Sequence, residues 1–108
     1  LNVTQQVRLP AQEVRERFTA PVLKPVLAYA EVWFERTDQV TFHDPLAAAT
    51  IFAPDICTFT RCSVDIETAS PRVRGMTYFD PDEEGPHEIA LAVDPPKYWD
   101  HLFKTFEA

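Results

Sequence analysis

The spacing of apolar side chains changes along this chain of 108 residues, and that change limits the folds it can adopt. Across residues 21–36 apolar side chains recur every three or four positions, which is typical of an amphipathic helix with a broad buried face. One stripe of that helix consists of Val22, Val26, Ala30 and Trp33, and the adjoining stripe consists of Leu23, Leu27, Ala30 and Phe34. Across residues 58–68 apolar and acidic side chains alternate in part, which favours a strand. Helices in the first half and strands in the second are therefore expected.

Turn residues and local apolar patterns divide the remaining sequence into shorter elements. Helices are expected over 10–18, 45–53 and 95–106, and further strands over 73–79 and 88–93, after an extended lead-in. Three helices, three neighbouring strands and a docking helix predict an α+β chain with a small antiparallel sheet. No repeat or linker divides the sequence, so residues 1–108 are expected to form a single unit.

The chain carries a formal net charge of −7, and its acidic residues are concentrated after Arg36. Up to Arg36, five basic residues stand against four acidic ones, whereas the remainder has five basic and thirteen acidic residues. Such a surface repels phosphate backbones, so no nucleic-acid partner is expected. The longest apolar run, 46–53, is far shorter than the roughly 20 residues that span a bilayer, so no membrane partner is expected either.

The few cysteines and glycines of the chain exclude several classes of site. Cys57 and Cys62 lie in one strand-like stretch, and no second Cys/His cluster completes a zinc site. We expect both thiols to be free and reduced, which suits a cytoplasmic protein. Gly75 and Gly85 are the only glycines, and they lie too far apart for a P-loop or a dinucleotide fingerprint.

Two arginines and an acidic segment lie in the strand-rich second half. Arg72 and Arg74 are expected to pair across the sheet with the carboxylates of Asp65 or Glu67. The acidic segment 80–86 lacks the ligand spacing of an EF-hand, so a solvated hairpin turn is expected there.

The sequence His43-Asp44-Pro45 is the candidate for chemistry, and it has two interpretations. Asp is a preferred N-cap residue because its carboxylate accepts N–H bonds of the first helical turn, and Pro is favoured at the next position. A second Asp-Pro pair, Asp94-Pro95, is expected to start the last helix for the same reason. The other interpretation is that His43 and Asp44 serve catalysis.

The sequence Phe42-His43-Asp44-Pro45-Leu46-Ala47, followed by an apolar helix, resembles the C-terminal signature of the inosine–uridine preferring nucleoside hydrolase family. Other segments resemble this family in the same order, namely 1–7, 64–68, 74–77, 89–94 and 98–100. The resemblance covers this chain essentially from end to end, but it covers only the C-terminal portion of such an enzyme. The family's Asp-rich first loop, which supplies most calcium ligands, and its ribose-binding middle segment are expected to lie outside this chain.

The resemblance implies a parent fold with an open α/β sheet, of which this chain is a single C-terminal portion. It implies that Asp44 is a calcium ligand and that His43 faces the leaving base and protonates it. A related purine-preferring subgroup has an aromatic residue at that place, so His43 favours inosine–uridine specificity. Aromatic side chains of the preceding helix flank the base in some members. Tyr29 and Trp33 are the candidates here, although the apolar stripe favours core packing for Trp33.

The resemblance thus implies that this chain is a portion of a calcium-dependent ribonucleoside hydrolase that cleaves the N-glycosidic bond of nucleosides. Calcium takes about 6–8 oxygen ligands and Asp44 supplies one or two of them, so the chain alone is expected to be inactive. Separation of this portion from the parent enzyme is expected to leave apolar surface of the 21–36 helix exposed, and such surface predicts a homo-oligomer. The rival hypothesis is a non-catalytic interaction module, in which Asp44 only caps a helix and the acidic surface governs association.

Overall fold

The computed structural model describes residues 3–107 and divides the chain into two compact units. Residues 1–57 and 93–108 belong to the first unit, and residues 58–92 belong to the second. Leu1 and Asn2, which open the first segment of the family resemblance, lie outside the described residues. Helices and two antiparallel sheets make up the described part of the chain, which confirms the α+β class predicted from the sequence.

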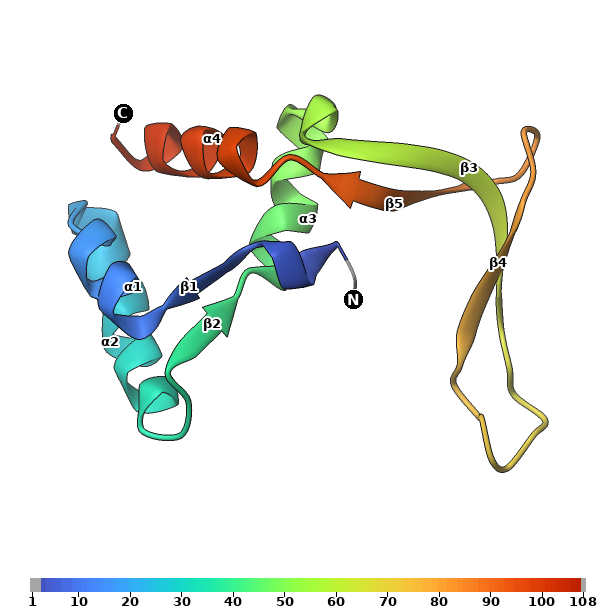
Figure 1. Ribbon diagram of the computed structural model, residues 1–108, viewed down its shortest axis with the longest axis horizontal. Helices are drawn as coiled ribbons and strands as arrows, with labels where there is room; N and C mark the ends of the chain where they lie inside the picture. The colour runs from blue at the N-terminus through green and yellow to red at the C-terminus, as the bar shows by residue number, and fades with distance from the viewer. Residues whose placement is uncertain (1–2, 108) are drawn as a thin grey trace. The chain divides into compact units, whose positions relative to one another are not determined.

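The first unit contains the helices and the smaller sheet (Figure 1). Its elements are η1 (Thr4–Gln6), β1 (Arg8–Pro10), α1 (Ala11–Arg17), η2 (Pro21–Leu23), α2 (Lys24–Phe34), β2 (Gln39–Thr41), α3 (His43–Phe52), η3 (Pro54–Ile56) and α4 (Pro95–Glu107). The four α-helices found here agree with the expected helices to within a few residues. The expected 21–36 helix is divided into a 3-10 turn and α2, with Pro25 in the first turn of α2, where its missing N–H costs least.

Strands β1 and β2 pair antiparallel, which the sequence did not predict beyond an extended lead-in. Their register places Arg8 opposite Thr41 and Leu9 opposite Val40. The pairing is continued by Phe42, whose backbone N–H donates to the carbonyl of Val7 at 3.0 Å. The short sheet therefore fixes the backbone immediately before α3.

The core of the first unit is an aromatic cluster between α1, the end of β2 and α4. Phe42 meets Phe18 edge to face with ring centroids 6.2 Å apart, and it meets Trp99 at 5.1 Å. Phe103 lies 6.3 Å from Phe18 and 6.2 Å from Trp99, and the guanidinium of Arg17 sits 3.7 Å from the Phe103 ring centroid. Such aromatic pairs contribute about 0.5–1.5 kcal/mol each beyond their burial. The apolar stripe predicted for the last helix thus packs as expected.

The broad buried face predicted for residues 21–36 is present only in part. Val22, Val26 and Trp33 of one stripe are exposed, whereas Leu23 of the adjoining stripe is buried and Leu27 and Phe34 are half-buried. No residue of α2 is buried, and Trp33 and Tyr29 are 58% and 81% exposed. The helix is held instead at Leu23, which is buried just before it, and by Arg15 of α1. Two nitrogens of Arg15 donate to the two carboxylate oxygens of Glu31 at 2.8 and 2.7 Å. The expectation that this helix exposes apolar surface is confirmed.

The second unit is an antiparallel sheet of three strands in the order β4-β3-β5. Its strands are β3 (Cys57–Ile66), β4 (Thr77–Pro81) and β5 (His87–Val93), and β3 begins at the end of the first unit. Strand β4 begins later than the predicted strand 73–79 because a turn occupies residues 71–75. Gly75 has a φ of 88° in that turn, a conformation that costs glycine little.

Arg72 and Arg74 lie in the same turn and not in a strand, so the predicted cross-strand ion pairs are wrong. The carboxylates expected to pair with them have other partners. Asp65 accepts a hydrogen bond from the Tyr78 hydroxyl at 3.3 Å, and one oxygen of Glu67 accepts the backbone N–H groups of residues 69 and 70. These two backbone bonds lower the pKa of Glu67 below its usual value.

The cysteine prediction is confirmed, because Cys57 and Cys62 are both free and buried. Burial raises the pKa of the Cys57 thiol, which keeps it in the unreactive protonated form. The backbone at Cys62 also explains one of the two glycines. A Cβ at position 85 would collide with the backbone carbonyl of Cys62, so Gly85 permits a close approach in the turn before β5.

Candidate functional site

The start of α3 presents two polar side chains between two buried anchors. Phe42, which precedes the helix, and Leu46 in its first turn are 7% and 3% exposed. The residues between them, His43, Asp44 and Pro45, are all exposed. Because β2 and the aromatic cluster fix Phe42, the backbone that carries His43 and Asp44 is positioned rigidly while their side chains face outward. A rigid scaffold with outward polar groups suits a functional site.

Asp44 does not cap α3. The helix begins at His43, its N-cap residue is Phe42, and no side-chain bond caps this end. Asp94 behaves differently, because its Oδ1 accepts the backbone N–H of Lys97 at 3.1 Å at the start of α4. The capping prediction is thus confirmed for Asp94 and wrong for Asp44.

Neither His43 nor Asp44 has a side-chain hydrogen bond or ion pair with any residue in the range 3–107. Asp44 lies in the first turn of α3, near the positive end of the helix dipole. An imidazole and a carboxylate that are exposed and unoccupied by protein partners remain free to bind a ligand. That freedom is what a catalytic acid and a metal ligand would both require.

An apolar groove with a volume of about 420 Å³ lies beside this helix start. Thr41, Phe42 and Pro45 line it on one side, and Val26 and Phe106 belong to its other walls. His43 and Asp44 do not themselves line the groove, although their sequence neighbours on both sides do. Val22, Val26 and Ala30, which the sequence predicts to be part of a buried face, line this groove and are the sequence signal for it.

The two aromatic candidates of α2 do not line the groove, and their side chains are exposed. The indole N–H of Trp33 donates to the backbone carbonyl of Gln39 at 3.2 Å. Core packing, the role favoured for Trp33 by the apolar stripe, is therefore wrong: this bond ties the end of α2 to the start of β2. Within residues 3–107, no contact brings Tyr29 or Trp33 to His43.

The described residues do not form a complete calcium site. No group of three or more His, Cys, Asp or Glu side chains within residues 3–107 could hold a metal ion. Calcium takes about 6–8 oxygen ligands, and Asp44 offers a single carboxylate of the right chemistry. At this helix start the chain therefore offers one carboxylate ligand, which is part of a calcium site and not a complete one.

The sequence between positions 1 and 100 matches the family model of inosine-uridine preferring nucleoside hydrolases. The chain belongs to this family. The predicted resemblance is thereby confirmed, and it extends over the helix start that carries His43 and Asp44 as well as over both sheets.

A solved structure of a plant nucleoside hydrolase, the PpNRh1 enzyme, has the same fold as this chain. The TM-score is 0.71 at 16% sequence identity, and the match covers 100% of this chain and 40% of the plant chain. This chain therefore spans less than half the length of that nucleoside hydrolase. The chain has no significant match among curated proteins. Of the helices within residues 3–107, none combines the length and hydropathy that crossing a bilayer requires.

Proposed function

We propose that this chain supplies His43 and Asp44 to the active site of a hydrolase that cleaves nucleosides of the inosine or uridine type into base and ribose. The observation that carries the proposal is the helix start described above. Two side chains of complementary chemistry are exposed and without protein partners there, between the buried anchors Phe42 and Leu46. Family membership supplies the reaction class.

His43 would act as the general acid of this reaction. Cleavage breaks the bond between the ribose C1′ and a nitrogen of the base, and the bonding electrons leave with the base. The imidazolium of His43 would give its proton to the departing base, while water adds to C1′ and releases a proton in turn. Proton donation of this kind typically contributes about 10²–10⁴-fold to the rate. An exposed imidazole on a rigid helix start can reach such a leaving group.

Asp44 would be one ligand of a bound calcium ion, the remaining oxygen ligands coming from outside residues 3–107. When bound, calcium would fix sugar hydroxyls and lower the pKa of a coordinated water. Because Asp44 provides only one carboxylate, we propose that the 108-residue chain alone lacks hydrolase activity. Tyr29 and Trp33 are proposed as weaker contacts to the base, since both present exposed aromatic surface on α2.

The proposal also covers the cell compartment of the protein and its partners. Two free, buried thiols suit a reducing compartment, and we place the protein in the cytoplasm. The net charge of −7 makes nucleic acid an unfavourable partner, whereas a neutral nucleoside is unaffected by it. The exposed apolar face of α2 supports self-association.

The test is turnover of inosine and uridine by the intact protein that contains this chain, with and without calcium. His43→Ala should lower kcat by at least about 100-fold, and His101→Ala serves as a control that removes a histidine elsewhere. Asp44→Asn should weaken the response to calcium, with Asp38→Asn as its control. Unchanged turnover in His43→Ala would remove this residue from the mechanism, and absence of any turnover in the wild type would refute the proposed reaction.

Calorimetry on the 108-residue chain tests the ligand count separately. Weak or undetectable calcium binding is expected, because one carboxylate does not hold the ion. Tight binding would reveal a complete site within this chain and contradict the proposal.

A further inference from the structure

Strand β4 is an open edge of the sheet in the second unit. The strand order is β4-β3-β5, so within residues 3–107 β4 has a neighbouring strand on one side only. Every residue of β4 is exposed, including two aromatic ones, Tyr78 at 42% and Phe79 at 40%. An exposed edge with apolar side chains is a template for pairing with another strand.

The hydrogen bonds at both ends of the β3–β4 hairpin show which backbone groups of β4 remain unpaired. The backbone N–H of Glu67 donates to the carbonyl of Met76 at 2.9 Å, and that of Asp82 donates to the carbonyl of Arg61 at 3.2 Å. In an antiparallel ladder, residues that bond to the neighbouring strand alternate with residues that do not. The residues of β4 that bond to β3 are therefore even-numbered, such as Tyr78.

It follows that Thr77 and Phe79 direct their N–H and C=O groups away from β3. Pro81 follows them in the same orientation but has no N–H to donate, so the free ladder is confined to Thr77 and Phe79. A second β4 strand can pair with these residues if it runs antiparallel and is centred on Tyr78. Thr77 of one copy then exchanges two hydrogen bonds with Phe79 of the other, and the two-fold axis repeats the exchange.

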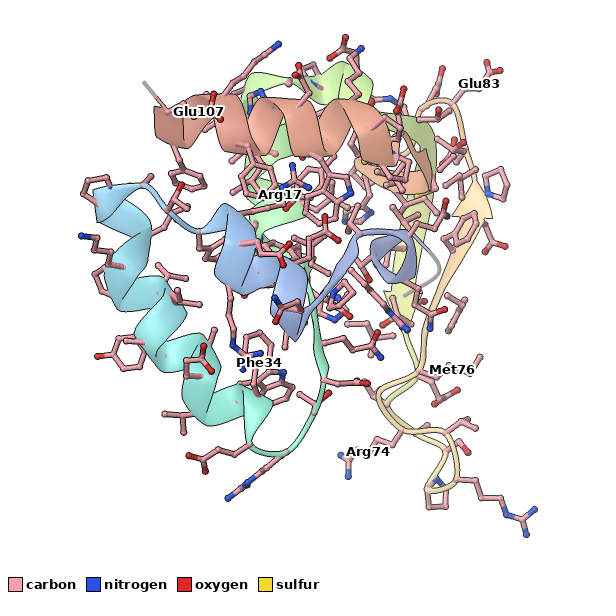
Figure 2. All side chains as sticks on the ribbon, turned by 60° about the vertical axis from the view of Figure 1, so that its left-hand side comes forward. Arg17, Phe34, Arg74, Met76, Glu83 and Glu107 are labelled. Carbon is pink, nitrogen blue, oxygen red and sulfur yellow. The ribbon has the colours of Figure 1, made fainter. Side chains whose placement is uncertain are left out.

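The charges beyond the two ends of β4 are complementary for this arrangement. Arg72 and Arg74 lie in the turn before the strand, and neither has an ion-pair partner among residues 3–107. Glu83 and Glu84 lie in the turn after it, and their carboxylates are likewise without a cationic partner in that range. Figure 2 shows Arg74 and Glu83 at opposite ends of the hairpin.

An antiparallel pair centred on Tyr78 brings the arginine end of each copy to the glutamate end of the other. Parallel pairing or stacking in the same direction would instead bring like charges together. The charge pattern of the unit thus selects a second copy of this chain, in one orientation, as the occupant of the edge.

The side chains on one face of the sheet also continue across such a pair. Val64 lies opposite Phe79 and Ile66 opposite Thr77, so these four residues share one face. In the paired arrangement Phe79 becomes the neighbour of Thr77 from the second copy on the same face. The apolar row of one hairpin would then continue into the next.

We propose that β4 is a homodimer interface, in which two copies form one continuous sheet by antiparallel pairing centred on Tyr78. This interface does not depend on nucleoside hydrolysis, and it is distinct from association through the apolar face of α2. The first test is sedimentation of the 108-residue chain over a range of concentrations, where a monomer–dimer equilibrium is expected. A monomer at every concentration overturns the proposal.

Thr77→Pro tests the backbone pairing. It removes an outward N–H and leaves the bonds between β3 and β4 in place, because Thr77 does not donate to β3. The dimer loses two symmetry-related hydrogen bonds, so its Kd should rise about tenfold or more. Circular dichroism confirms that the variant is folded, and Val32→Asp on exposed α2 is the matched control for the other association surface. A dimer that Val32→Asp disrupts and Thr77→Pro does not overturns the proposal.

Charge reversal tests the orientation and remains decisive if Thr77→Pro does not fold. The double variants Arg72→Glu/Arg74→Glu and Glu83→Lys/Glu84→Lys should each weaken the dimer about tenfold or more at low salt. The quadruple variant that combines them should restore dimerisation. The control pair Arg8→Glu/Arg36→Glu makes the same change in net charge within the first unit and should leave the dimer intact. Equal effects of the control and test variants, or no rescue in the quadruple variant, overturn the proposal.

Discussion

Two helices of this chain start with the same dipeptide, Asp-Pro, and the two carboxylates do different things. At α4, Asp94 accepts the backbone N–H of Lys97, and its own N–H donates to the carbonyl of Ile56 at 2.9 Å. At α3, Asp44 makes no capping bond and faces outward. The comparison separates a carboxylate that holds the fold together from one that the fold leaves available.

The cause of the difference is the backbone in front of each helix. Before α3, the bond from Phe42 to Val7 and the burial of the Phe42 ring set the chain direction, so that the helix begins at His43. The N–H of Leu46 then donates to the carbonyl of Phe42 at 3.3 Å. Asp44 therefore falls inside the first turn, where its side chain cannot serve as the N-cap. The first residue of α3 is therefore set by long-range contacts of Phe42 and not by capping through Asp44.

The largest effect is expected from His43. In the intact protein, His43→Ala should lower nucleoside turnover by about 10²–10⁴-fold, because the leaving base loses its proton donor. The melting temperature should stay within about 1 °C of wild type, since the side chain is exposed and makes no hydrogen bond or ion pair within residues 3–107. Steady-state kinetics and calorimetry measure the two quantities. A large loss of stability would show that the start of α3 holds the fold together, as the start of α4 does, and would contradict the difference drawn between the two helices.

Of the two aspartates, Asp94 and Asp44, substitution of Asp94 by alanine is expected to lower stability more. Loss of the N-cap bond to Lys97 should lower the free energy of unfolding by about 1 kcal/mol. Asp94→Asn retains a capping oxygen and should recover most of that loss. Urea unfolding followed by circular dichroism measures both variants, and a negligible change in Asp94→Ala would contradict the capping role.

Asp44→Ala should lower the free energy of unfolding by only about 0.3–0.5 kcal/mol, the lower end for a carboxylate near a helix dipole. The loss should shrink further in added salt, because the interaction is electrostatic and exposed. The same unfolding experiment compares it with Asp94→Ala at low and high salt. If Asp44→Ala lost as much stability as Asp94→Ala, Asp44 would have to cap α3, which would contradict the absence of a capping bond there.

A smaller, pH-dependent effect is expected beside Asp94. The side-chain hydrogen bond and ion pair with Lys97 lower the pKa of Asp55, so this pair stabilises the fold while Asp55 is ionised. The contribution is present above the unfolded pKa, which is about 4, and is lost as pH falls through the lower folded pKa. Asp55→Asn should therefore be less stable than wild type at neutral pH, and the difference should vanish in acid. Unfolding curves measured between about pH 2 and pH 7 test this.

Local signals predicted most elements of the fold. The helical period located α2 and α4, and the alternation of apolar and acidic residues located β3. The pairing of β1 with β2 was not predicted, because it joins short segments far apart in the sequence and no local pattern encodes it. The turn that holds Arg72 and Arg74 was not predicted, because the pattern of apolar residues does not report the positive φ that Gly75 adopts there.

The candidate site was predicted in part for similar reasons. The residue types His43 and Asp44 stand out in the sequence, but their exposure depends on Phe42 being fixed by a distant strand and by Trp99. The role of Trp33 was misjudged because an apolar stripe indicates a face that avoids water without indicating what covers it. Arg15 of α1 lies over the ring of Phe34, but Trp33 stays largely exposed and its indole N–H bonds to the carbonyl of Gln39.

The placement of the two tryptophans has a practical consequence. Trp33 is largely exposed on α2, whereas Trp99 is half-buried in edge-to-face and tilted contacts with Phe42 and Tyr98. Their fluorescence should therefore separate into a red-shifted emission from Trp33 that acrylamide quenches readily and a less red-shifted emission from Trp99 that acrylamide quenches less readily. A partner that settles on α2 would shift the first signal and leave the second unchanged, so the native chain carries its own pair of optical reporters.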